Sequence, residues 1–227
     1  MIPSWLHLLA LAALLIGLAC AVAIAIDVLR HPQHMAIMNL VWPVTALYAG
    51  PIALWGYFRY GRQSPVSMKT DPPFAVSVGK GATHCGAGCT LGDIIAEWLG
   101  YFFPAIAVWF GWQTLFADKI FAIWIVDFVF AFLIGIVFQY FAIVPMRGLS
   151  FGKGVIAALK ADTLSLTAWQ IGMYGFMAFA QFYLFGTRLE VNKVEFWFVM
   201  QIAMLCGFIT SYPVNWWLIE AGIKERM

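Results

Sequence analysis

The residues best suited to chemistry in this chain form a series spaced four apart, within a glycine-rich apolar segment. Two thiols, Cys85 and Cys89, are followed at the same interval by Asp93 and Glu97, and His84 precedes the first thiol. Residues four apart on an α-helix differ by about 40° in direction, so the series covers one helix face. Thiolates, imidazoles and carboxylates bind transition metals, and soft sulfur ligands favour Cu(I) and Zn(II). The spacing therefore predicts a transition-metal site on this face, with copper favoured over zinc or iron.

The same segment also fits simple helix packing. Free cysteine is often a small buried hydrophobe, and Gly88 and Gly92 have the spacing of closely packed membrane helices. Packing does not account for Asp93 and Glu97, because a carboxyl group within a membrane is costly. Both interpretations of the thiols stay open.

A second candidate metal site lies near the start of another apolar segment, at His34, Met35 and Met38. An imidazole beside thioethers suits copper capture. This site is expected to face the side of the membrane opposite the thiols. The alternative is an interfacial histidine beside lipid-facing methionines.

Further polar residues interrupt the later apolar segments. Asp127 stands alone on its segment, and Lys160 is the nearest candidate partner for Asp162. A mostly one-sided stripe follows, made of Asp162, Ser165, Gln170, Met173, Met177 and Gln181. Such a stripe, together with Asp127, either lines an interior path or holds neighbouring helices together through hydrogen bonds.

The elements that must position these residues are membrane helices. Of the 227 residues, 63% are hydrophobic and 11% are charged, whereas soluble domains have about 25% charged residues. The mean hydropathy is +0.85. Since a spanning helix needs about 20 apolar residues, the chain is expected to form one all-α transmembrane domain over residues 1–227. Six helices are predicted near residues 5–28, 35–58, 81–112, 120–143, 154–185 and 196–219, with a loop at 59–80.

The distribution of basic residues predicts the orientation, because cytoplasmic loops carry an excess of Lys and Arg. Six spans with both termini inside put nine of the 13 basic residues on the cytoplasmic side and four outside. The first segment is expected to be an anchor rather than a cleaved signal peptide, because its apolar core is too long. These features indicate a multi-pass membrane protein in contact with the lipid bilayer.

Some classes of function are excluded by what the sequence lacks. It has no phosphate-binding Walker loop, no His-Glu-x-x-His zinc helix and no Gly-x-Ser-x-Gly elbow, so no nucleotide cofactor is expected. The net charge is only +2, with basic residues scattered over loops, so nucleic acid is not an expected partner.

Three stretches together resemble a known family. They are His84-Cys-Gly-Ala-Gly-Cys-Thr-Leu-Gly-Asp93, Lys160-Ala-Asp-x-Leu-Ser-Leu166 and Met38-Asn-x-Val-Trp-Pro43. The chain resembles, over nearly its whole length, the bacterial integral-membrane family catalogued as domain of unknown function 4396. The resemblance implies a compact multi-helix protein of a bacterial inner membrane and implies no activity.

Three functions fit these observations. The favoured one is a membrane protein that binds and transports a transition-metal ion through the Cys, His and carboxylate residues. The second is a membrane metalloenzyme or thiol oxidoreductase that uses the same residues as a fixed centre. The third is an accessory subunit of a larger membrane complex, in which the series serves helix packing. A homo-oligomer is compatible with each.

Overall fold

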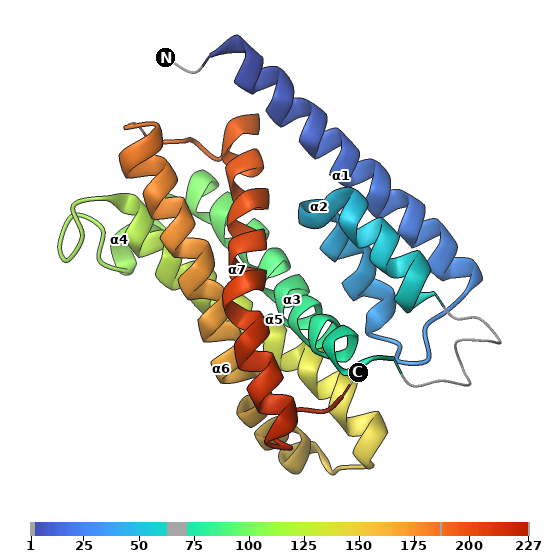
Figure 1. The fold of residues 1–227 in the computed structure, drawn as a ribbon. Helices are drawn as coiled ribbons and strands as arrows, with labels where there is room; N and C mark the ends of the chain where they lie inside the picture. The colour runs from blue at the N-terminus through green and yellow to red at the C-terminus, as the bar shows by residue number, and fades with distance from the viewer. Residues whose placement is uncertain (1–2, 63–71, 187, 227) are drawn as a thin grey trace.

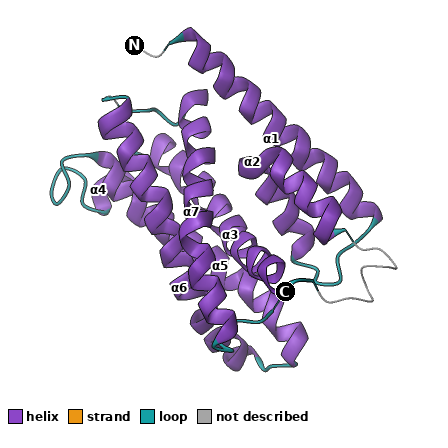
Figure 2. Ribbon diagram, viewed as in Figure 1, coloured by secondary structure: helices purple, strands orange, loops and turns teal. Residues whose placement is uncertain are grey.

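The computed structural model describes residues 3–62, 72–186 and 188–226, and this part of the chain is all-α (Figures 1 and 2). Its helices are α1 Ser4–Arg30, α2 Met38–Gly56, α3 Phe74–Phe102, α4 Ala105–Trp109, α5 Lys119–Arg147, α6 Phe151–Ala178 and α7 Val194–Glu220, with π-helical segments η1 Tyr57–Gly61 and η3 Phe179–Leu184 continuing α2 and α6. Of the described helices, α1, α5 and α7 are long and apolar enough to cross a membrane. The all-α class is therefore confirmed.

The third predicted helix differs in its bounds. It begins at Phe74 and ends at Phe102, before a separate short helix α4 capped by Pro104. The break follows from Pro104, since the residue before a proline is pushed out of the helical region, and Phe103 has φ −127° and ψ 76°. The predicted loop 59–80 is shorter than expected, because η1 and α3 take its two ends; its residues 63–71 lie outside the described part.

Helix α2 folds back on itself. Gly50 has φ 50° and ψ −124°, and Pro51 follows it. The rings of Trp42 and Tyr57 consequently lie 5.6 Å apart, although 15 residues of straight helix would span about 22 Å. A positive φ suits glycine, and proline cannot continue the hydrogen-bond ladder. The prediction that residues 35–58 form a single crossing helix is therefore wrong: α2 and η1 form a helical hairpin.

Helix α1 fixes both the base and the tip of this hairpin. At the base, Asp27 near the end of α1 accepts hydrogen bonds from Tyr57 Oη at 2.8 Å and Arg62 Nε at 3.0 Å. At the tip, a Cβ on Gly17 would lie 2.7 Å from the carbonyl oxygen of Leu47. Because Gly17 is midway along α1, the hairpin reaches only about half the depth of the bundle.

Helix α3 runs through the middle of the bundle, in contact with α2, α5, α6 and α7 (Figure 1). Its closest partner is α5. A Cβ at Gly92 would lie 2.4 Å from the backbone nitrogen of Ala131, and one at Gly88 would lie 3.1 Å from Gly135 Cα. Glycine at these positions lets the two backbones touch, which confirms the packing expected from the Gly88 and Gly92 spacing.

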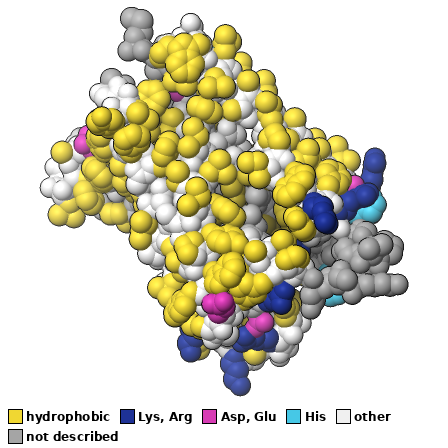
Figure 3. Space-filling model, viewed as in Figure 1, with side chains coloured by type: hydrophobic (Ala, Val, Ile, Leu, Met, Phe, Trp, Pro, Cys, Tyr) yellow, Lys and Arg dark blue, Asp and Glu magenta, His cyan; other side chains and the backbone are white. Residues whose placement is uncertain are grey.

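The outer surface is largely apolar, with large side chains such as Leu8, Leu133, Ile171 and Ile209 more than half exposed. This surface indicates contact with a lipid bilayer. Basic residues gather at one end (Figure 3). Of the 12 described Lys and Arg residues, nine lie where α1 ends and α3 begins, namely Arg30, Arg59, Arg62, Lys80, Arg147, Lys153, Lys160, Lys224 and Arg226, and three, Lys119, Arg188 and Lys193, lie at the other end.

The two ends of the chain lie at opposite ends of the bundle (Figure 1). Near the N-terminus, His7 Nδ1 is 2.7 Å from Glu195 Oε1 at the start of α7. Near the C-terminus, Arg226 Nε is 3.2 Å from Ser77 Oγ at the start of α3. The sequence predicts both termini on one side, and the difference arises because α2 returns to the end from which it starts.

Candidate functional site

The predicted series on α3 is entirely inside the protein. His84, Cys85, Cys89 and Asp93 are fully buried, and Glu97 is 6% exposed. The helix face expected from the four-residue spacing is therefore turned toward α5, α6 and α7 instead of lipid.

At the end of the bundle where α3 begins, a buried ion pair lies beside this face. Lys224 Nζ is 3.3 Å from Asp162 Oδ1, and neither side chain is exposed. The ammonium also lies 3.4 Å from Ser165 Oγ and 3.4 Å from the carbonyl oxygen of Gly81. The expectation that Lys160 pairs with Asp162 is wrong, because Lys160 points outward and the segment after α7 supplies the cation.

The two thiols continue from this ion pair. The Cys85 side chain lies beside the carboxyl group of Asp162 and beside Cys89. His84 is placed differently: its ring meets Phe138 edge-on, with centroids 5.9 Å apart, and neither ring nitrogen has a hydrogen-bond partner among the described residues. Across residues 3–62, 72–186 and 188–226, no group of three His, Cys, Asp or Glu side chains is arranged to hold a metal ion. The geometry gives no support to a resident metal centre at His84, Cys85 and Cys89.

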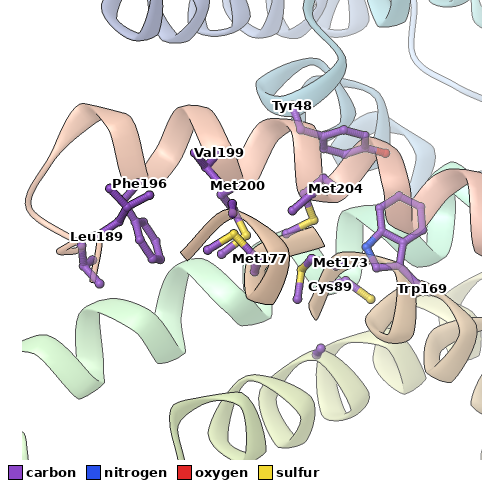
Figure 4. Packing of buried hydrophobic residues seen from close by; sticks show 14 of the residues in the cluster. Tyr48, Cys89, Trp169, Met173, Met177, Leu189, Phe196, Val199, Met200 and Met204 are labelled. Atoms are coloured by element: carbon purple, nitrogen blue, oxygen red, sulfur yellow. The ribbon is translucent and has the colours of Figure 1, made fainter. Parts of the chain in front are cut away.

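Methionines surround the middle of the series. Met173 and Met177 of the predicted stripe are fully buried, and they share one cluster with Cys89, Met200 and Met204 (Figure 4). The last two, from α7, were missed in the sequence. Their spacing of four is the only signal that could have indicated them, and methionine at that spacing is common in helix cores.

A group of buried acids follows toward the other end. Asp93 Oδ1 is 3.5 Å from Gln170 Nε2. Its Oδ2 has no hydrogen-bond partner in the described part of the chain, and neither has either carboxyl oxygen of Asp127. Tyr48, at the tip of the hairpin, is also buried with its hydroxyl unpaired there. Asp93 and Gln170 therefore meet between α3 and α6, and Asp127 is buried near Asp93 on α5. That these residues line an interior path stays a prediction.

Glu97 lies where this interior meets the far end of the bundle. It lines a small cavity of about 20 Å³ together with Lys119, Gln181, Arg188 and Glu190, room for about one water molecule. Both basic residues there come from the sparsely charged end. The series on α3 thus connects the Lys224–Asp162 pair at one end with this charged cavity at the other.

The second predicted metal site is displaced from its expected position. Met38 is buried and belongs to the same cluster as Phe138, while His34 and Met35 line a cavity of about 750 Å³ with Pro145 and Met146 at the end of α5. These residues lie at the same end of the bundle as Cys85, so the expectation that they face the opposite side is wrong.

The charge balance inside the bundle is uneven. Four carboxyl groups are buried along α3, α5 and α6, those of Asp93, Glu97, Asp127 and Asp162. Among the described residues, the one ammonium or guanidinium group buried with them is that of Lys224. An isolated carboxylate is costly in such surroundings, so the remaining acids must be protonated or bind a cation.

Comparison with known protein families gives one match, which runs from near the start of α3 to the C-terminal segment. A family model described as "Domain of unknown function (DUF4396)" matches residues 76–224, well over half of the chain. This match includes the buried series and Lys224, and it leaves out α1 and α2. No curated protein and no solved structure matches the chain.

Proposed function

The chain belongs to the DUF4396 family, whose description assigns no activity, and we propose that it is an integral membrane protein that carries a cation across the bilayer. The observation that supports this proposal most strongly is the row of buried acids. From Gly81, beside Lys224, to Glu97, α3 rises about 24 Å. Over this length Asp162, Asp93, Asp127 and Glu97 offer successive places for a proton or another cation.

The energetic argument rests on the cost of charge in a membrane. A bundle that only needed packing would be more stable with apolar side chains at these positions. Ionisable residues inside membrane proteins commonly face a path for ions or protons. Here all four acids are buried inside the bundle and do not face lipid, and the hydrogen-bonding residues Gln170 and Ser165 are buried with them.

Charged groups lie at both ends of the row of acids, which supports a path that can be closed at each end. The Lys224–Asp162 pair occupies one end, and Glu97 lies in the charged cavity at the other. The positive-inside rule favours the Lys224 end as the cytoplasmic one, since nine of the 12 described basic residues lie there. In this proposal α1, α3, α5, α6 and α7 cross the membrane, and the α2 hairpin enters and leaves on the cytoplasmic side.

The hairpin also fits transport. Many secondary transporters bind substrates near the bilayer midplane, where helices are interrupted. Gly50 and Pro51 interrupt α2 at about half the depth of α1. Tyr48 beside them lies in edge-to-face contact with Trp169 of α6, with centroids 5.8 Å apart.

A transition-metal ion, with copper favoured, is a second candidate for the cargo. The observation in its favour is the run of sulfur atoms from Cys85 and Cys89 to the four buried methionines. Thiol and thioether ligands select Cu(I). In this version the sulfur atoms bind the ion only transiently during transport. Such binding does not require a permanent site with three converging ligands.

Flux into proteoliposomes tests the proposal. Purified protein is reconstituted with an internal pH-sensitive dye, and a potassium gradient with valinomycin sets an interior-negative potential. Protons alone should acidify the interior faster than in protein-free vesicles, and Glu97→Gln should abolish the difference. Glu220→Gln, at an exposed position, is the matched control and should keep the wild-type rate.

The same vesicles test the metal cargo with external Cu(I) or Zn(II) and an internal metal-sensitive dye. If neither protons nor either metal ion enter faster than in protein-free vesicles, the carrier proposal is wrong. A metal that co-purifies in stoichiometric amount without any flux would instead favour the fixed metalloenzyme centre. A co-purifying membrane subunit without flux would favour the accessory role.

A further inference from the structure

A half-open cavity of about 190 Å³ lies beside the row of acids, bordered by α1, the hairpin tip, α3 and α7. Its walls include Tyr48, Asp93, Trp197, Met200 and Met204. The cation path uses Asp93 but gives no role to this space or to the aromatic residues around it.

The cavity is lined by one acidic residue, and most of its other walls are apolar. Thr90 and Gln201 also line it, and each donates a hydrogen bond to a backbone carbonyl oxygen. Asp93 is fully buried, and its Oδ2 has no hydrogen-bond partner among the described residues. Gln170, the partner of the other oxygen, does not line the cavity. The Tyr48 hydroxyl is also buried without a described partner. A buried polar group without a partner is costly, so a ligand that pairs with Asp93 here would remove that cost.

The remaining walls favour an organic cation. The faces of tyrosine and tryptophan rings attract cations, and this attraction is strongest where water is excluded. Methionine side chains adapt to ligands of different shape. Acid, aromatic rings and thioethers together therefore suit a positive charge that carries an apolar group.

The size of the cavity distinguishes this ligand from a bare metal ion. A cavity of about 150 Å³ in another protein binds benzene. The space beside Asp93 is somewhat larger, so it would hold an aromatic ring with a small cationic group, whereas a metal ion would leave most of it empty.

We propose that this cavity is a binding site for a small monovalent organic cation with an aromatic or branched alkyl group, whose charge pairs with Asp93. The inference rests on the proposed function and names its substrate class. Because Asp93 also belongs to the row of acids, the organic cation and a proton occupy the same carboxylate in turn. In this arrangement the organic cation and protons compete for one site of the carrier.

Binding of benzylammonium, the protonated form of benzylamine, to the purified protein in a non-ionic detergent, measured by titration calorimetry, tests the site. Wild-type protein should bind the cation saturably. Asp93→Asn should weaken binding about 30-fold, as expected when one partner of a desolvated charge pair is removed. Glu220→Gln changes an exposed acid that does not line the cavity, and it should leave the affinity within about twofold, well below 1 kcal/mol.

A second pair of variants keeps the test decisive if Asp93→Asn fails to fold. Leu14 lines the cavity from α1, so Leu14→Trp should fill it and abolish binding. Leu15 is 56% exposed on the outer face of α1, and Leu15→Trp should bind as the wild type does. Absence of saturable binding to the wild type, or equal affinity in Leu14→Trp and Leu15→Trp, would overturn the proposal.

The binding measurement needs no gradient, so its outcome is separable from that of the flux assay. Binding that depends on Asp93 without any flux would retain the site and reject the carrier. Proton flux that depends on Glu97 in a protein without saturable binding would retain the carrier and reject the site.

Discussion

Lys224, four residues after the end of α7, places its ammonium 3.3 Å from the carboxyl group of Asp162 on α6, and both side chains are fully buried. The pair closes the end of the bundle at which α3 begins. It also ties the C-terminal segment to the centre, because Lys224 Nζ lies 3.4 Å from the carbonyl oxygen of Gly81.

Lys224→Met should destabilise the protein by about 3 kcal/mol, since removing one partner leaves a buried charge uncompensated. Unfolding by SDS in mixed micelles measures this loss. The double variant Lys224→Met/Asp162→Asn should recover most of the stability, because it removes both charges. Lys153→Met, at an exposed position, is the control. A double variant no more stable than Lys224→Met would show that the ion pair is not the cause.

Replacing both thiols tests the sulfur residues as metal ligands. If copper is the cargo, protein purified from copper-supplemented cells without chelator should contain copper, and Cys85→Ser/Cys89→Ser should lose it, because soft ligands select this ion. Elemental analysis of both proteins makes the measurement. Cys206→Ser, in which a thiol outside the series is changed, is the matched control. Equal copper contents in all three proteins would exclude the two thiols as ligands.

The buried series was predictable because it depends on local geometry. A spacing of four places side chains on one helix face, and ionisable groups in an apolar segment favour the interior over lipid. Contacts between distant parts of the chain were not predictable in this way. Lys224 meets Asp162 across 62 residues, and nothing in the sequence around either residue specifies the other.

The six apolar segments were also predictable, and each contains a described helix. Whether a segment crosses the membrane or turns back was not predictable, because hydropathy measures the composition of a segment and not its path. Residues 35–58 are apolar enough to suggest a crossing, yet Gly50 and Pro51 turn them back. This one turn changes the expected side of His34, Met35 and Met38 and of the N-terminus.

The close packing of α3 on α5 provides a third prediction. Gly92→Ala should destabilise the protein by about 2 kcal/mol, because a methyl group there would lie 2.4 Å from the backbone of Ala131. Gly175→Ala, where a Cβ would have no neighbour within 4 Å, should be neutral or stabilising by up to about 1 kcal/mol. The SDS unfolding assay compares the two variants. Equal stabilities would mean that α3 and α5 are further apart than 2.4 Å implies.

The path of α2 can be tested by labelling in intact cells. In a variant without Cys20, Cys85, Cys89 and Cys206, single cysteines replace exposed residues. If α2 is a hairpin, Ala36→Cys and Arg59→Cys, which precede and follow its turn, should react with a membrane-impermeant maleimide from the same side as Lys153→Cys. Leu115→Cys, at the other end of the bundle, should react from the opposite side.

The labelling pattern distinguishes the path of α2 from the orientation of the whole protein in the membrane. The positive-inside rule predicts that Leu115→Cys reacts in intact cells and that the other three react only after permeabilisation. A protein inserted the other way round would exchange the two classes and still keep Ala36→Cys with Arg59→Cys. A straight α2 would cross the membrane between them, because 23 residues of continuous helix extend about 35 Å and the hydrocarbon core is about 30 Å thick. Reaction of these two cysteines from opposite sides would therefore contradict the hairpin, whichever way the protein is inserted.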